Sequence, residues 1–120
     1  MKKNKGKIIL IDDDEVFCEE LTKIIRSEGY QISAFSDSLR GLDSLSNNVY
    51  DLLLLDLKTP HLSGSDVLSI IRQKGIKIKI IVITGNPDKE KIGIPDLVLV
   101  KPFDPKHLIA KIKELTETED

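Results

Sequence analysis

Four short apolar runs, each followed at once by a polar or charged residue, constrain the fold of this chain more than any other feature. The runs span residues 8–11, 52–55, 80–83 and 97–100, and they lead into Asp12, Asp56, Thr84 and Lys101. Apolar runs of this length, separated by helix-like segments, are typical of buried parallel strands. Because such strands all point the same way, and ligands bind beyond their carboxyl ends, we expect the four polar ends to meet in one pocket.

The expected pocket combines carboxylates, a hydroxyl and an ammonium group. Asp12, Asp13 and Asp56 supply the carboxylates, and oxygen ligands of this kind suit Mg²⁺. Two unit charges about 4 Å apart interact by about 4 kcal/mol at an effective dielectric constant near 20, so the clustered carboxylates need counter-charge. Mg²⁺ and Lys101 would provide it, and a carboxylate can itself accept a phosphoryl group. The pattern therefore indicates a metal and phosphoryl site.

Helical segments alternate with the apolar runs along the chain. The strands are predicted at Lys7–Ile11, Tyr30–Phe35, Asp51–Asp56, Ile78–Ile83 and Leu97–Val100. Helices are predicted to begin near Asp14 or Glu15, near Ser36 or Asp37, before Val67, and at Asp104-Pro105. This alternation predicts an α/β fold with a doubly wound, five-stranded parallel sheet in the order 2-1-3-4-5 and helices on both faces.

The segment Gly85–Asp96, between the last two strands, departs from the alternation. It contains Pro87, Gly93 and Pro95, so that at most residues 87–92 could turn helically. A mean helix needs about 11–12 residues. The helix that would connect these two strands is therefore predicted to be shortened or absent.

Length, charge and composition exclude several classes of protein. The 120 residues fit one domain, here residues 1–120 with a core of about 7–115. A net charge of −2 and 4% aromatic residues argue against direct nucleic-acid binding. No apolar run approaches the roughly 20 residues that span a bilayer, so no membrane insertion is expected. The single Cys18 and the lack of a signal-peptide pattern favour a cytoplasmic protein.

The placed residues resemble the receiver domain of two-component response regulators. The resemblance runs from about Lys7 to Leu115 and rests on Asp12-Asp13, Asp56, Thr84 and Lys101-Pro102-Phe103, together with the loop at residues 60–64. It is specific because five positions on four strands agree in order and location. It implies a flavodoxin-like fold.

The resemblance also implies a role for each matched residue. Asp56 would be the phosphoacceptor, and Asp12 and Asp13 would bind Mg²⁺ with Asp56 and the backbone carbonyl of Lys58. Thr84 would contact the phosphoryl group, Lys101 would pair with it, and Lys101-Pro102 would be a cis peptide. The phosphoryl group would come from a sensor histidine kinase or a phosphotransfer protein, and an unidentified output protein or domain would receive the signal. The domain would not be an enzyme, apart from catalysing its own phosphorylation and dephosphorylation.

One position departs from the family pattern. Val98 stands three residues before Lys101, where the family usually has an aromatic residue. We therefore expect phosphorylation to change the segment Gly85–Asp96 rather than the rotamer of an aromatic side chain.

Other functions, and purely structural roles for some residues, stay open beside this interpretation. Val98 also fits a phosphorylation-independent interaction domain of the pseudo-receiver kind. A phosphatase of the haloacid dehalogenase type would need a second Asp where Lys58 stands, and a dinucleotide-binding domain would need a Gly-x-Gly-x-x-Gly run after the first strand. Elsewhere, Asp14 is expected to start a helix and Cys18 to fill space, and two residues are expected to face solvent: His61 and His107.

Overall fold

The computed structural model describes residues 5–58, 62–86 and 95–117. Its elements follow one another in the order β1 (Lys7–Ile11), α1 (Glu15–Ser27), β2 (Gln31–Phe35), α2 (Ser38–Asn47), β3 (Leu52–Asp56), α3 (Gly64–Gln73), β4 (Lys79–Thr84), β5 (Leu97–Val100) and α4 (Pro105–Thr116). From β1 to β4, strands and helices alternate as predicted.

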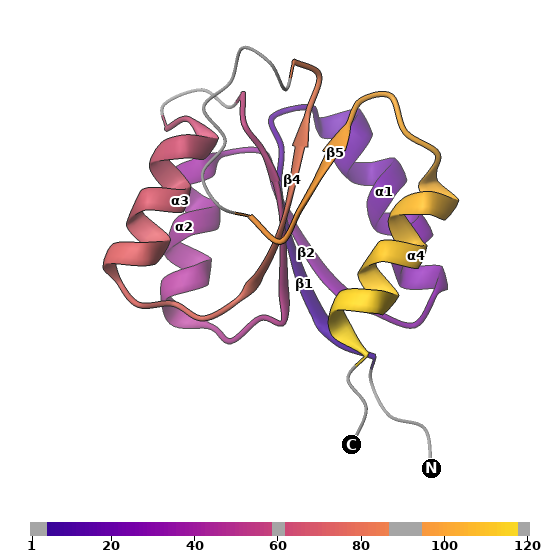
Figure 1. Ribbon diagram of the computed structural model, residues 1–120, viewed down its shortest axis with the longest axis horizontal. Helices are drawn as coiled ribbons and strands as arrows, with labels where there is room; N and C mark the ends of the chain where they lie inside the picture. Colours follow the sequence, from indigo (N-terminus) through magenta and orange to yellow (C-terminus); the bar gives the residue numbers. More distant parts are fainter. Residues whose placement is uncertain (1–4, 59–61, 87–94, 118–120) are drawn as a thin grey trace.

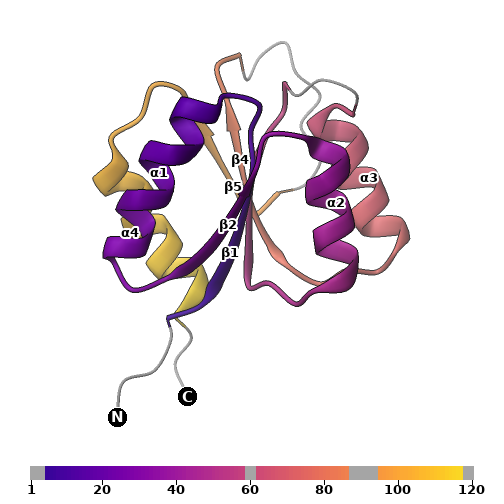
Figure 2. The same cartoon turned by 180° about the vertical axis from the view of Figure 1, so that it is seen from behind.

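The five strands form one parallel sheet in the order β2-β1-β3-β4-β5, which confirms the predicted flavodoxin-like topology. Helices α1 and α4 cover one face, and α2 and α3 cover the other (Figures 1 and 2). Every residue of β3 is buried, because this strand lies between β1 and β4 and under helices on both sides. Alternate β3 residues enter two separate cores, one on each face of the sheet.

Side chains that accept from backbone N–H groups fix where each helix begins. Asp14, Asp37 and Asp104 cap α1, α2 and α4, and Pro105 follows Asp104 at the first helical position. Ser63 caps α3 in a reciprocal arrangement with Asp66, whose carboxylate accepts from the Ser63 backbone. These caps place the helix starts at the carboxyl edge of the sheet, next to the strand ends.

Three strands differ by a residue or so from their predicted limits. β2 and β3 begin one residue later than predicted, and β4 is shifted to run from Lys79 through Thr84. Asp51 lies just before β3, and its carboxylate accepts a hydrogen bond from the Lys7 backbone N–H at 2.8 Å. β4 includes Thr84 because Thr84 pairs with Val100 of β5.

The described parts of the chain contain four helices, and none of them lies between β4 and β5. The prediction of a shortened or absent helix there falls mainly on residues 87–94, which lie outside the described residues. The leucines of α2 are buried to different extents. Leu45 is in the core, whereas Leu39 is 51% exposed.

Candidate functional site

Strand register brings the predicted polar residues to one edge of the sheet. Ile11 of β1 pairs with Leu55 of β3, so the next residues, Asp12 and Asp56, lie level with each other. Thr84 pairs with the last residue of β5, after which the Lys101 N–H donates to the Thr84 carbonyl at 2.8 Å. The adjacency of β1 and β3 in the sheet thus juxtaposes two carboxylates that are far apart in the sequence.

Three carboxylates form the acidic part of this site. One oxygen from each of Asp12, Asp13 and Asp56 lies within 4.8 Å of the others. Asp12 is fully buried and Asp56 is 6% exposed, whereas Asp13 lies at the surface. A cluster of carboxylate oxygens that opens to solvent on one side suits a hard cation such as Mg²⁺, which keeps several of its waters. The residues present therefore fit the predicted metal.

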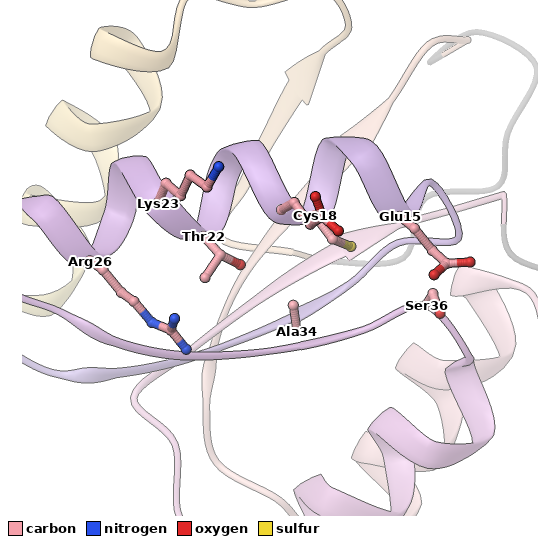
Figure 3. A pocket seen from close by; sticks show the side chains of 8 residues that line it. Glu15, Cys18, Thr22, Lys23, Arg26, Ala34 and Ser36 are labelled. Carbon is pink, nitrogen blue, oxygen red and sulfur yellow. The ribbon is translucent and has the colours of Figure 1, made fainter.

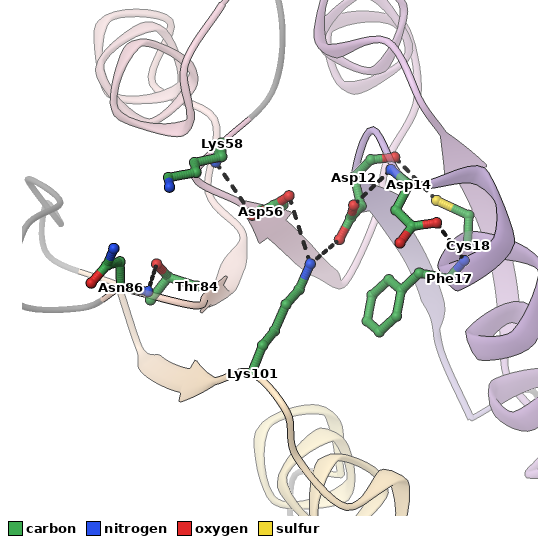
Figure 4. A network of polar contacts seen from close by, with 9 residues as sticks. All are labelled: Asp12, Asp14, Phe17, Cys18, Asp56, Lys58, Thr84, Asn86 and Lys101. Carbon is green, nitrogen blue, oxygen red and sulfur yellow. Dashed lines mark hydrogen bonds and ion pairs between the residues drawn. The ribbon is translucent and has the colours of Figure 1, made fainter.

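The ammonium group of Lys101 supplies positive charge within this cluster. Its Nζ atom lies 3.0 Å from Asp12 Oδ2 and 3.8 Å from Asp56 Oδ2 (Figure 4). Burial lowers the pKa of Lys101, but the hydrogen bond to Asp12 and the charges of Asp12 and Asp56 together raise it above its ordinary value. Lys101 is therefore a permanent cation at neutral pH.

The carboxyl group of Asp56 is harder to ionise than an ordinary aspartate. Burial, and then the negative charge of Asp12, raise its pKa to about 6, although Lys101 and the backbone N–H of Lys58 act in the opposite direction. That N–H donates to Asp56 Oδ1 at 3.3 Å, while the Lys58 side chain is exposed and turned away (Figure 4). Asp56 is thus mostly a carboxylate at pH 7, in an environment that favours its neutralisation.

Thr84 and the turn after β5 complete the predicted set. The Thr84 side chain is buried, and its hydroxyl accepts a hydrogen bond from the Asn86 N–H at 3.1 Å. The Lys101–Pro102 peptide bond is cis, as predicted. The predicted site residues Asp12, Asp13, Asp56, Lys58, Thr84 and Lys101 therefore all lie at the carboxyl edge of the sheet.

Neighbouring residues have the structural roles that the sequence suggested. Asp14 caps α1, and its N–H donates to Asp12 Oδ1 at 2.9 Å. Cys18 is buried, and its thiol donates to the Asp12 carbonyl at 3.2 Å. His107 is exposed on α4, and His61 lies outside the described residues.

A separate groove of ≈ 360 Å³ lies between α1 and β2 (Figure 3). Glu15, Cys18, Thr22 and Arg26 are among its lining residues. Burial, and then the charge of Asp12, raise the pKa of the Cys18 thiol to about 12, so this thiol is no nucleophile at neutral pH. The groove therefore does not compete with the carboxylate cluster as a reactive centre.

Phe17, in the first turn of α1, also lies at this site, although the sequence predicted only that a helix begins near Asp14 or Glu15. Its ring centroid lies 4.6 Å from Lys101 Nζ. No sequence pattern indicated that an ammonium group lies over this ring.

Within the described residues, no helix is long and apolar enough to cross a membrane.

Comparison with known proteins identifies relatives of this arrangement. Residues 8–113 match the family model described as "Response regulator receiver domain". The transcriptional regulatory protein YkoG of Bacillus subtilis is 34% identical over an aligned length of 127 residues, and the match covers 97% of this chain and 55% of that protein. The DNA-binding response regulator MtrA of Mycolicibacterium smegmatis is 32% identical over 97% of this chain and 53% of its own length. The chain thus spans about half the length of these curated relatives.

Solved structures agree with these matches. The receiver domain of the Francisella response regulator 1452 superposes with a TM-score of 0.86 at 26% identity, covering 92% of this chain and 96% of that one. The response regulator TrrA of Thermotoga maritima, solved in complex with Mg²⁺ and BeF, superposes with a TM-score of 0.82 at 30% identity, covering 91% of this chain and 97% of that one.

Proposed function

The chain belongs to the response regulator receiver domain family, and on that premise we propose that it accepts a phosphoryl group on Asp56 and signals by a change in conformation. The observation that carries this proposal is the cluster in which the Asp56 carboxylate lies within 4.8 Å of those of Asp12 and Asp13 and 3.8 Å from the ammonium of Lys101. The phosphoryl donor would be a sensor histidine kinase or a phosphotransfer protein.

In the proposed reaction, a carboxylate oxygen of Asp56 attacks phosphorus while the bond from phosphorus to the donor breaks and the donor takes the bonding electrons. Asp12, Asp13 and Asp56, with the carbonyl of Lys58, would hold Mg²⁺, which supplies positive charge against the carboxylates and the phosphoryl oxygens. The ammonium group of Lys101 would pair with one phosphoryl oxygen. The Thr84 hydroxyl, whose oxygen accepts from the Asn86 N–H, would donate to another.

Intact mass measurement after incubation with Mg²⁺ and acetyl phosphate tests this proposal. We expect one added phosphoryl group on the wild-type chain and none on Asp56→Asn. Asp51→Asn is the matched control, because Asp51 lies at the opposite edge of the sheet and an amide oxygen can still accept from Lys7. Equal labelling of the Asp56 variant would reject Asp56 as the acceptor.

We propose that the signal leaves through the segment that follows Thr84. The Thr84 hydroxyl accepts from the Asn86 N–H, so a hydroxyl that turns toward a phosphoryl group would release this amide. Amide hydrogen exchange with and without beryllofluoride should then show faster exchange at Asn86. Identical exchange across residues 85–96, with changes on another face, would contradict this route.

A phosphorylation-independent interaction domain is the second candidate. It is favoured by β5, whose four residues are aliphatic, with Val98 packed against the core beside α2 and α3. No aromatic ring is available there to turn inward on phosphorylation. If the wild-type chain acquires no phosphoryl group from acetyl phosphate or from a histidine kinase, this second function replaces the first.

We also propose that the output lies outside the residues described here. The relatives include a DNA-binding response regulator, MtrA, but this chain spans only about half of the relatives' length. The net charge of this chain is −2. A phosphate backbone attracts domains with clustered positive charge. Any contact with DNA would therefore be made by another domain or protein.

A further inference from the structure

The ammonium group of Lys101 contacts an aromatic ring as well as two carboxylates. Phe17, in the first turn of α1, places its ring centroid 4.6 Å from Lys101 Nζ, a separation at which a cation is attracted to the face of a ring. Asp12 and Asp56 lie 3.0 Å and 3.8 Å from the same nitrogen. In Figure 4, the ring and the carboxylate of Asp12 both flank the end of the Lys101 side chain.

The same ring also holds the turn that carries Lys101. Phe103 lies two residues after Lys101, and its ring meets that of Phe17 at 84° with the centroids 6.1 Å apart. Perpendicular aromatic pairs at this distance attract each other beyond their shared burial. Phe17 therefore contacts the turn between β5 and α4 at two points, the ammonium of Lys101 and the ring of Phe103.

We propose that Phe17 is a positioning residue for phosphoryl transfer, whose ring keeps the Lys101 ammonium directed at the oxygen atoms around Asp56. This inference rests on the proposed function, and it adds a residue from α1 to a site otherwise built from strand ends and the turns after them. Lysine has a flexible four-carbon stem, so the ring adds a second restriction on the position of the ammonium, beside the hydrogen bond to Asp12. Attraction to the ring restricts that freedom while it leaves the N–H groups free to bond oxygen.

The effect depends on the charge distribution of the ring and not on its volume alone. Fluorine atoms withdraw electron density from the face of a phenylalanine ring with little change in shape. A series of mono-, di- and trifluorinated phenylalanines at position 17 therefore weakens the attraction in steps. Phe35 offers the matched control, because its side chain packs on the other face of the sheet, against the core beside α2 and α3.

The experiment measures the rate of phosphorylation by acetyl phosphate at saturating Mg²⁺ for both series. We expect the maximal rate to fall stepwise with each fluorine at position 17, by about three- to tenfold over the series, with little change in the KM for acetyl phosphate. The series at position 35 should keep the wild-type rate. Phe17→Tyr should retain most of the activity, whereas Phe17→Leu should lose as much as the most fluorinated ring.

The possible outcomes separate this inference from the function on which it rests. A wild-type chain that acquires no phosphoryl group overturns both. A wild-type chain that is phosphorylated, with equal rates across the fluorinated series at position 17, overturns the role of Phe17 alone. A fall that is equal at positions 17 and 35 also overturns it, because fluorination would then act through general packing.

Discussion

The ammonium group of Lys101 lies 3.0 Å from a carboxylate oxygen of Asp12, whose side chain is fully buried. A buried carboxylate requires a partner, since an unpaired charge is costly to remove from water. The hydrogen bond between them therefore stabilises Asp12 in the absence of metal, and it holds Lys101 beside the oxygen atoms that would bind Mg²⁺. Lys101 and the metal then compete for the same negative charge.

Removing the charge of Lys101 should strengthen metal binding. In Lys101→Met, the carboxylates lose their only close cation among the described residues, and no positive charge repels Mg²⁺ from them. We expect the Mg²⁺ dissociation constant to fall about tenfold, as judged from Coulomb energies at an effective dielectric near 20. Isothermal titration would measure it. Lys101→Arg keeps the charge and should bind Mg²⁺ about as the wild type does; tighter binding by both variants would point to relaxed packing instead.

The stability of the metal-free protein should depend on pH through Asp56. Its pKa is about 6 in the folded protein, above the ordinary value of 3.8, so the folded state holds the proton more tightly than the unfolded state. Proton binding to Asp56 therefore stabilises the fold fully below about pH 4, and this stabilisation is lost as the pH rises to about 6. The free energy of unfolding should fall by an amount on the order of 1–3 kcal/mol over this range. At higher pH, where Asp56 is ionised, the metal-free protein should be less stable than it is with Asp56 protonated.

Asp56→Asn isolates this contribution from those of other carboxylates. In the absence of metal, urea unfolding should show that the stability of Asp56→Asn relative to wild type increases between about pH 4 and pH 6. A difference that stays constant over this range would show that Asp56 titrates normally.

Asp13 should contribute strongly to metal affinity and little to stability. Its side chain is exposed, yet one of its oxygens lies within 4.8 Å of those of Asp12 and Asp56. We expect Asp13→Asn to weaken Mg²⁺ binding by about tenfold or more, because one of three charged ligands is lost. Asp51→Asn, which removes the same charge at the other edge of the sheet, should leave the titration unchanged. An equal loss in both variants would mean that net charge, not ligation, sets the affinity.

Gly64 should be essential for packing next to the acceptor. A Cβ atom at this position would lie 2.6 Å from the Leu57 Cα atom, and the Gly64 N–H already donates to the Leu57 carbonyl at 2.9 Å. We expect Gly64→Ala to destabilise the fold by about 1–3 kcal/mol, since backbone must move to admit the methyl group. Thermal unfolding would measure this. Gly85→Ala is the control, because its Cβ would meet nothing within 4 Å; equal destabilisation of the two variants would refute the steric account.

Sequence periodicity was sufficient to predict the sheet order and which polar residues lie at its carboxyl edge. The reason is physical: each apolar run marks a buried strand, and each strand delivers the next residue to the same edge. Helix caps followed from Asp14 and Asp104 in the same way. Strand limits were less predictable, because an apolar run does not mark the residue at which backbone pairing begins or ends.

The contacts between distant segments could not be predicted from the sequence. Phe17 and Lys101 lie on different elements, and only the packing of α1 beside the turn after β5 brings ring and ammonium together. The hydrogen bond from the Cys18 thiol to the Asp12 carbonyl likewise depends on the orientation of α1 relative to β1. Such contacts depend on the orientation of whole elements, which local patterns do not specify.

Because the strands are parallel, the acidic site and the start of β1 lie at opposite edges of the sheet. β1 begins, and α4 ends, at the edge of the sheet opposite the carboxylates (Figure 1). There the Thr116 hydroxyl donates a hydrogen bond to the Tyr30 hydroxyl. An affinity tag or a fluorophore joined near either of these points would stand a full strand length from Asp56. The protein could therefore be immobilised on a sensor surface by either point, with its acidic site facing the solution.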